Sequence, residues 1–162
     1  MAGVVGIKVK KNNLGLAGEF MVAGKLLRMN YDASITFGMT KRLDIIYHDP
    51  KTGKTGQVQV KSAQQNSKNP NKNGFTILTA SFNELKKRGK ELVGNLPYVC
   101  VFFASDGTER YFVVPPEDVL RILLRRFEEY YARGGTQSRD ARSPHILYVG
   151  DILEYENRWD LL

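Results

Sequence analysis

The sequence is poor in the residues that build cross-links and many metal centres. It has one cysteine and two histidines in 162 residues. A single cysteine excludes an internal disulfide, and Cys100 lies in an apolar run, so we expect a buried and unreactive thiol. His48 and His145 lack the spacing of a helical zinc motif, and we expect them at the surface or at an interface. This cysteine usage fits a reducing cytoplasm.

Long hydrophobic runs are also missing. The longest wholly apolar stretch covers residues 98–104, whereas a helix that spans a bilayer needs about 20 apolar residues. The first residues are apolar and are followed by Lys8, Lys10 and Lys11, which reverses the order found in a secretory signal. We therefore expect a cytoplasmic protein with no membrane partner.

Negative charge is scarce relative to positive charge. The sequence has 24 Lys and Arg against 17 Asp and Glu, which gives a formal net charge of +7 and a pI of about 9.5. A field of this sign attracts polyanions and disfavours strongly acidic partners. Nucleic acid is therefore the expected partner, although charge alone does not distinguish a protein that cuts nucleic acid from one that only binds it.

The pattern of apolar residues predicts a single α/β domain over residues 1–162, with a central mixed β-sheet flanked by helices. We expect helices over residues 14–29, from Ser81 with a capping box to Glu84, and over 117–132. The expected strands cover residues 31–37, 43–48, 57–62, 75–79, 98–104, 111–114 and 146–149. The turn residues between the second and third strands predict an antiparallel hairpin.

The first expected helix carries an acid beside its apolar side. The apolar residues that share one narrow arc, and that we expect to face the core, are Leu16, Phe20, Ala23 and Leu27. Glu19 lies next to this arc. An acid in such a place is costly unless it is paired or binds a cation.

We expect polar residues of the hairpin to lie close to Glu19. Gln59 and Lys61 share one face of their strand, and the hairpin brings Asp44 toward them. Mg²⁺ prefers oxygen ligands, which Glu19, Asp44, the Gln59 side chain and the main-chain carbonyl of Val60 supply. A bound metal ion lowers the pKa of its water and neutralises charge on a scissile phosphate, and Lys61 can orient that water or stabilise the same charge.

The order of a helix acid (Glu19), a strand acid (Asp44) and a Gln-x-Lys strand (59–61) resembles the PD-(D/E)XK nuclease superfamily. This is the fold of many restriction enzymes, archaeal Holliday-junction resolvases and some homing endonucleases. Residues 15–62 carry the resemblance, and QVKS after a turn looks like the QVKT of some small members. The resemblance implies a restriction-endonuclease-like core and hydrolysis of phosphodiester bonds in DNA with Mg²⁺ or Mn²⁺. It also implies a homodimer, because cutting both strands takes two active sites.

The chain departs from the family pattern at two positions. Leu43 stands where the family has proline, and Gln59 replaces the usual acid. Because Gln59 removes a negative charge from the expected metal site, a second hypothesis stays open: a nuclease-like fold that binds DNA or RNA without cutting. A third is a structural protein whose basic charge only confers solubility.

Two polar, basic loops are further candidates for contact with nucleic acid. They cover residues 64–74 and 133–143. We expect them either to contact the DNA backbone or simply to keep the protein soluble. The basic residues concerned are Lys68, Lys72, Arg133, Arg139 and Arg142.

Overall fold

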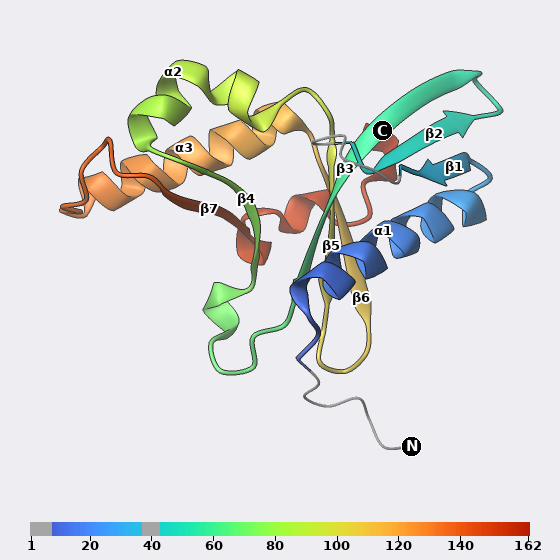
Figure 1. Cartoon of the computed structure of the whole chain (residues 1–162), viewed down its shortest axis with the longest axis horizontal. Helices are drawn as coiled ribbons and strands as arrows, with labels where there is room; N and C mark the ends of the chain where they lie inside the picture. The colour runs from blue at the N-terminus through green and yellow to red at the C-terminus, as the bar shows by residue number, and fades with distance from the viewer. Residues whose placement is uncertain (1–7, 37–42) are drawn as a thin grey trace.

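A computed structural model describes residues 8–36 and 43–162 of the chain. Within these ranges it has three α-helices and seven β-strands (Figure 1). The helices are α1 (Lys11–Arg28), α2 (Phe82–Val93) and α3 (Pro116–Ala132). The strands are β1 (Asp32–Ile35), β2 (Ile45–Asp49), β3 (Lys54–Gln64), β4 (Gly74–Ala80), β5 (Tyr98–Phe103), β6 (Glu109–Val114) and β7 (Ser143–Tyr148). The predicted α/β class is confirmed, and the expected end of the first strand at Phe37 lies outside the described residues.

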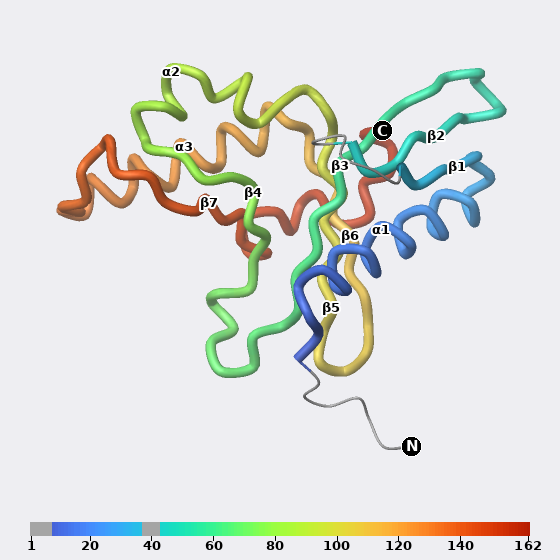
Figure 2. The backbone as a smooth tube through the Cα atoms, in the orientation of Figure 1, coloured from blue at the N-terminus to red at the C-terminus, as the bar shows by residue number. Residues whose placement is uncertain are grey.

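The central sheet is mixed, as expected. Its five described strands have the order β1-β2-β3-β5-β6, and β4 and β7 form a separate antiparallel pair. Only β3 and β5 run parallel in the central sheet. Parallel neighbours need a long crossover, and Figure 2 shows the chain leaving β3, passing through β4 and α2, and returning to β5. The predicted β2–β3 hairpin is confirmed by its antiparallel register.

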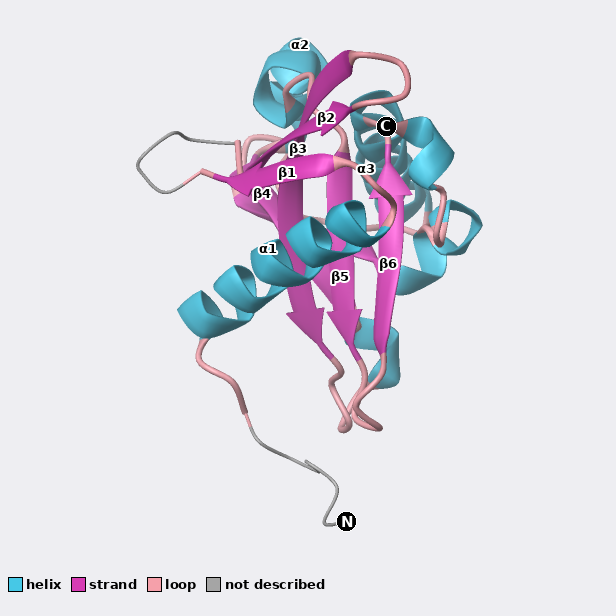
Figure 3. Ribbon diagram, turned by 90° about the vertical axis from the view of Figure 1, so that its right-hand side faces the viewer, coloured by secondary structure: helices cyan, strands magenta, loops and turns pink. Residues whose placement is uncertain are grey.

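Each face of the central sheet has its own core. We call the cluster under α1 the small core, because α1 is the one α-helix that the described ranges place on that face (Figure 3). Its members include Val22, Leu26, Ile45, Val58, Val60, Val99, Val101 and Val113. The large core lies on the other face, where α2, α3 and the β4–β7 pair cover the sheet. Its members include Phe75, Leu85, Cys100, Phe102, Phe112, Ile122, Leu123 and Leu147.

The buried face of α1 differs from the predicted one. The large residues expected in the core are instead exposed, at 43% for Leu16, 54% for Phe20 and 53% for Leu27. The helix buries Gly18, Val22, Ala23 and Leu26, so only Ala23 was assigned correctly. The reason is the close approach of Gly18 to β3, where a Cβ atom would collide with the hydroxyl of Ser62.

The start of α2 confirms the predicted capping box. The Ser81 hydroxyl accepts a hydrogen bond from the Glu84 main-chain N–H at 3.1 Å, and the Glu84 carboxylate accepts one from the Ser81 N–H at 2.8 Å. These bonds satisfy N–H groups that the first turn of a helix leaves without partners. The capping box therefore fixes the N-terminus of α2 at Ser81.

His145 lies in the interior rather than at the surface, so that prediction was wrong. It is 6% exposed, its Nε2 atom lies 2.9 Å from the carbonyl oxygen of Ala80, and the Phe127 ring packs against it at 4.8 Å between ring centres. Burial lowers the pKa of its imidazole. The spacing of polar residues does not indicate this environment, because pairing of β4 with β7, which are distant along the chain, forms it.

Across residues 8–36 and 43–162, no helix combines the length and the apolar character that crossing a membrane requires.

Candidate functional site

The candidate site lies where β3 stops pairing with β2 and starts pairing with β5. Ile45 is the first residue of β2 and pairs with Val58. Just before it, the Asp44 N–H donates to the Val58 carbonyl at 3.2 Å. The next residue of β3, Gln59, donates its N–H to the carbonyl of Pro97 at 2.9 Å, at the start of β5. The sheet therefore opens on the β2 side of β3 at this point.

Asp44 occupies this opening. Its Oδ2 atom accepts a hydrogen bond from the Val60 main-chain N–H at 2.6 Å. In a parallel ladder alternate residues direct their peptide groups at the same neighbour, and Gln59 directs its group at β5. Val60 therefore directs both its N–H and its carbonyl away from β5, toward the opening. The Asp44 carboxylate and the Val60 carbonyl accordingly lie on the same side of β3.

Glu19 approaches the opening from α1. It is half-buried, and its neighbour Gly18 lies against β3. Burial raises the pKa of the Glu19 carboxyl above its usual value, and the negative charge of Asp44 raises it further. The carboxylates of Glu19 and Asp44 thus lie within electrostatic range of each other. A divalent cation bound between them would reduce their repulsion.

Gln59 and Lys61 project from the face of β3 opposite α1. Val60 packs in the small core and Ala63 in the large core, so alternation places Gln59 and Lys61 on the large-core side. Lys61 pairs in register with Cys100. Burial raises the pKa of the Cys100 thiol to about 12, while the positive charge of Lys61 acts in the opposite direction. The Lys61 ammonium therefore lies near Cys100.

The structure thus places some of the expected site residues at the opening of the sheet and others beside it. Asp44 and the Val60 main chain lie together at the opening, and Glu19 on α1 lies within electrostatic range of Asp44. The β2–β3 register, continued by one residue, places Gln59 opposite Asp44. Among the described residues no group of three or more His, Cys, Asp or Glu side chains has the geometry of a metal site. The available donors are two carboxylates with amide and peptide carbonyl oxygens, a set that suits a hard cation such as Mg²⁺.

The basic side chains of the two predicted loops differ in whether they contact the rest of the protein. The Arg139 guanidinium lies 5.3 Å from the ring centre of Phe82 and 4.7 Å from that of Tyr131. Arg142 donates to the carbonyl of Thr79 at 2.9 Å. These two arginines therefore hold their loop against the protein. Other side chains of the two loops are exposed and have no ion pair within the described ranges, namely Lys68, Lys72 and Arg133.

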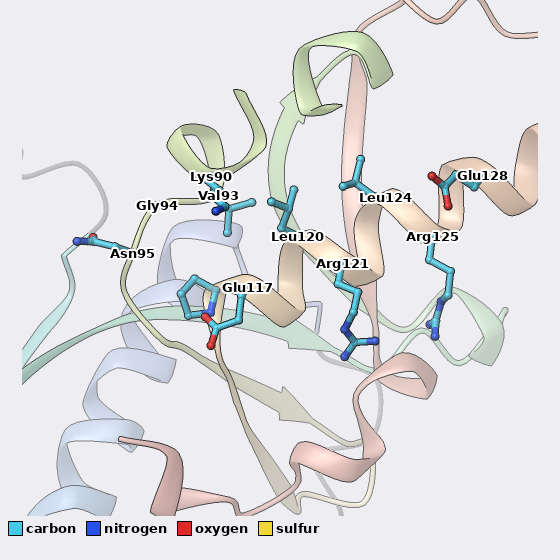
Figure 4. A pocket seen from close by; sticks show the side chains of 11 residues that line it. Lys90, Val93, Gly94, Asn95, Glu117, Leu120, Arg121, Leu124, Arg125 and Glu128 are labelled. Carbon is cyan, nitrogen blue, oxygen red and sulfur yellow. The ribbon is translucent and has the colours of Figure 1, made fainter. Parts of the chain in front are cut away.

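An open groove of about 940 Å³ lies between α2 and α3, away from the two carboxylates (Figure 4). Val93, Leu120 and Leu124 supply apolar surface, and Lys90 lies on the α2 side. The groove was not predicted, because helices distant in sequence form it. One signal was present in Gly89, where a Cβ atom would contact the Leu120 side chain at 2.5 Å, so the glycine permits close packing of the two helices.

The chain matches none of the protein-family models and none of the curated proteins with which it was compared. Its function must therefore be argued from the geometry of the site itself.

Proposed function

We propose that the protein is a divalent-metal-dependent endonuclease that hydrolyses phosphodiester bonds in DNA. The observation that carries this proposal is the pair of carboxylates near the opening of the sheet, where burial and, to a smaller extent, the charge of Asp44 raise the pKa of Glu19. A protein does not gain stability from two acids in such proximity. They lie near the edge of β3 just beyond its pairing with β2, where main-chain carbonyl oxygens could complete a cation-binding site.

Each residue has a distinct role in the proposed site. Glu19, Asp44, the Gln59 amide oxygen and the Val60 carbonyl would hold Mg²⁺ or Mn²⁺, and the bound ion would supply a water of lowered pKa and neutralise charge on the phosphate. The hydrogen bond from the Val60 main-chain N–H fixes the orientation of the Asp44 carboxylate. Lys61, on the other side of the strand from Glu19, would donate to the attacking water or to the phosphate oxygens.

Cleavage assays on plasmid, junction and single-stranded DNA with Mg²⁺ or Mn²⁺ test the proposal. We expect Asp44→Asn and Lys61→Ala to lower the rate by about 100-fold or more. Asp32→Asn serves as the matched control, because it makes the same change at an exposed position of β1, and it should leave the rate unchanged. No cleavage of any substrate, or equal rates for all the variants and the wild type, would contradict the proposal.

A second candidate function is nucleic-acid binding without cleavage. The observation that favours it is Gln59, which leaves the site with two carboxylates instead of three. This alternative predicts a salt-dependent affinity that survives Asp44→Ala and a melting temperature that Mn²⁺ does not change. A metal site instead predicts that Mn²⁺ raises the melting temperature of the wild type.

We also propose that the nuclease acts as a homodimer. Cutting both strands of a duplex with one small active site per chain calls for two copies related by a two-fold axis. Light scattering at micromolar concentration should report twice the monomer mass of 18.3 kDa. A monomer that cuts both strands of a plasmid at that concentration would contradict this stoichiometry.

A further inference from the structure

Helix α2 presents a row of lysines to solvent. Lys86, Lys87 and Lys90 are exposed, whereas Phe82, Leu85, Gly89 and Val93 are buried. In the part of the chain that the structure describes, none of the three lysines forms an ion pair. The acids of the helix are already engaged, Glu84 by Ser81 and an arginine, and Glu91 by Arg88. Like charges four residues apart on a helix repel one another. Binding of an anion from solution would relieve this repulsion.

The loop at residues 133–142 joins this row at the start of α2. The Asn83 main-chain N–H donates to the carbonyl of Arg139 at 3.1 Å. Arg142 lies 3.4 Å from the carboxylate of Glu84. These contacts fix the loop on α2, so its two arginines and the lysines of the helix belong to one surface. The sequence separates these two basic segments, and only the packing shows that they are adjacent.

The other end of α2 leads to the candidate site. The helix ends at Val93, and residues 94–97 connect it to β5 (Figure 1). The last of these, Pro97, accepts the hydrogen bond from Gln59 that marks the opening of the sheet. Lys90 and Asn95 lie along this route and line one end of the groove in Figure 4. The lysine row is therefore continuous along the chain with the opening that holds Asp44.

We propose that Lys86, Lys87 and Lys90, together with Arg139 and Arg142, form a surface that binds the phosphate backbone of duplex DNA. This inference rests on the proposed function, to which it adds a backbone-binding surface on the helix that residues 94–97 connect to the opening of the sheet. Lysine is a flexible point charge and suits phosphate contacts that do not depend on base sequence. The surface therefore contributes affinity and a salt dependence but no sequence preference.

Binding of a fluorescently labelled DNA duplex in EDTA tests this surface without cleavage. We compare Lys86→Ala/Lys90→Ala with Lys51→Ala/Lys54→Ala, which removes the same charge from exposed positions around the β2–β3 turn. The α2 variant should raise the Kd at low salt by about tenfold or more. It should also reduce the slope of log K against log salt by about 2, because each phosphate contact contributes about 0.9. The hairpin variant should change the slope little.

Equal losses of affinity in the two variants would show that only net charge matters and would overturn the proposed surface. Wild-type affinity in the α2 variant, or no binding by the wild type, would overturn it as well. Circular-dichroism melting checks that both variants stay folded. A surface that binds as expected while no cleavage occurs with Mn²⁺ would support the surface and contradict the endonuclease. Metal-dependent cleavage together with unchanged DNA binding by the α2 variant would support the endonuclease and contradict the surface.

Discussion

The two faces of the central sheet differ in what covers them. On one face α2, α3 and the β4–β7 pair enclose the large core, where Phe112 and Leu147 are fully buried. On the other face α1 is the one α-helix among the described residues, and Leu16, Phe20 and Leu27 remain exposed on its outer side. The large core therefore contains most of the buried side chains, whereas the thinner α1 layer keeps Glu19 and Asp44 only partly buried.

The largest expected effect is on the large core. Replacing Phe112, which is 0% exposed, by alanine should lower the free energy of unfolding by about 3–5 kcal/mol, because it removes buried apolar surface and leaves a cavity. Phe20→Ala removes the same side chain from a site that is 54% exposed and should cost less than about 0.5 kcal/mol. Urea unfolding measures both values. Comparable losses would mean that the outer side of α1 is buried after all.

The next effect separates two neighbouring leucines of α1. Leu26 is 0% exposed and Leu27 is 53% exposed. We expect Leu26→Ala to cost about 2–5 kcal/mol and Leu27→Ala less than about 0.5 kcal/mol. The two variants have identical compositions and helix propensities, so each is the control for the other in the same unfolding experiment. A larger cost for Leu27 would restore the helix face predicted from the sequence.

The smallest expected effect is a pH dependence due to Glu19. Its pKa is raised in the folded state by burial and by Asp44, so the folded protein holds this proton more tightly than the unfolded chain. Stability therefore falls as the pH rises through the interval from the usual value of 4.5 to the raised pKa. Without divalent cations, Glu19→Gln should be more stable relative to the wild type at pH 7 than at pH 4. Urea unfolding at the two pH values measures this difference, and a wild type that gains stability relative to Glu19→Gln on going to pH 7 would contradict it.

The sequence predicts the features that depend on near neighbours. The capping box of Ser81 and Glu84 and the hairpin between β2 and β3 are examples, because turn and cap chemistry acts over a few residues. The buried face of α1 was not predictable in the same way. Its outer apolar stripe is as regular as its inner one, and the choice depends on the fit of Gly18 against Ser62, far along the chain.

The site shows the same division between local and distant information. Alternation along β3 correctly separates Gln59 and Lys61 from Val60, because the period of a strand is a local property. Which face α1 covers depends on parallel pairing of β3 with β5 through the α2 crossover. That pairing places Glu19 and Lys61 on opposite sides of β3, so any shared site lies at the strand edge rather than on one face of the sheet.

The central claim, that Glu19 and Asp44 form a cation site at this edge, is tested most directly by Mn²⁺ binding. Electron paramagnetic resonance of free Mn²⁺ measures the affinity of the wild type, Glu19→Gln, Asp44→Asn and the control Asp32→Asn. We predict that the wild type and the control bind equally, and that each site variant binds at least about tenfold more weakly. Equal binding by all four proteins, or no binding by the wild type, would contradict the claim.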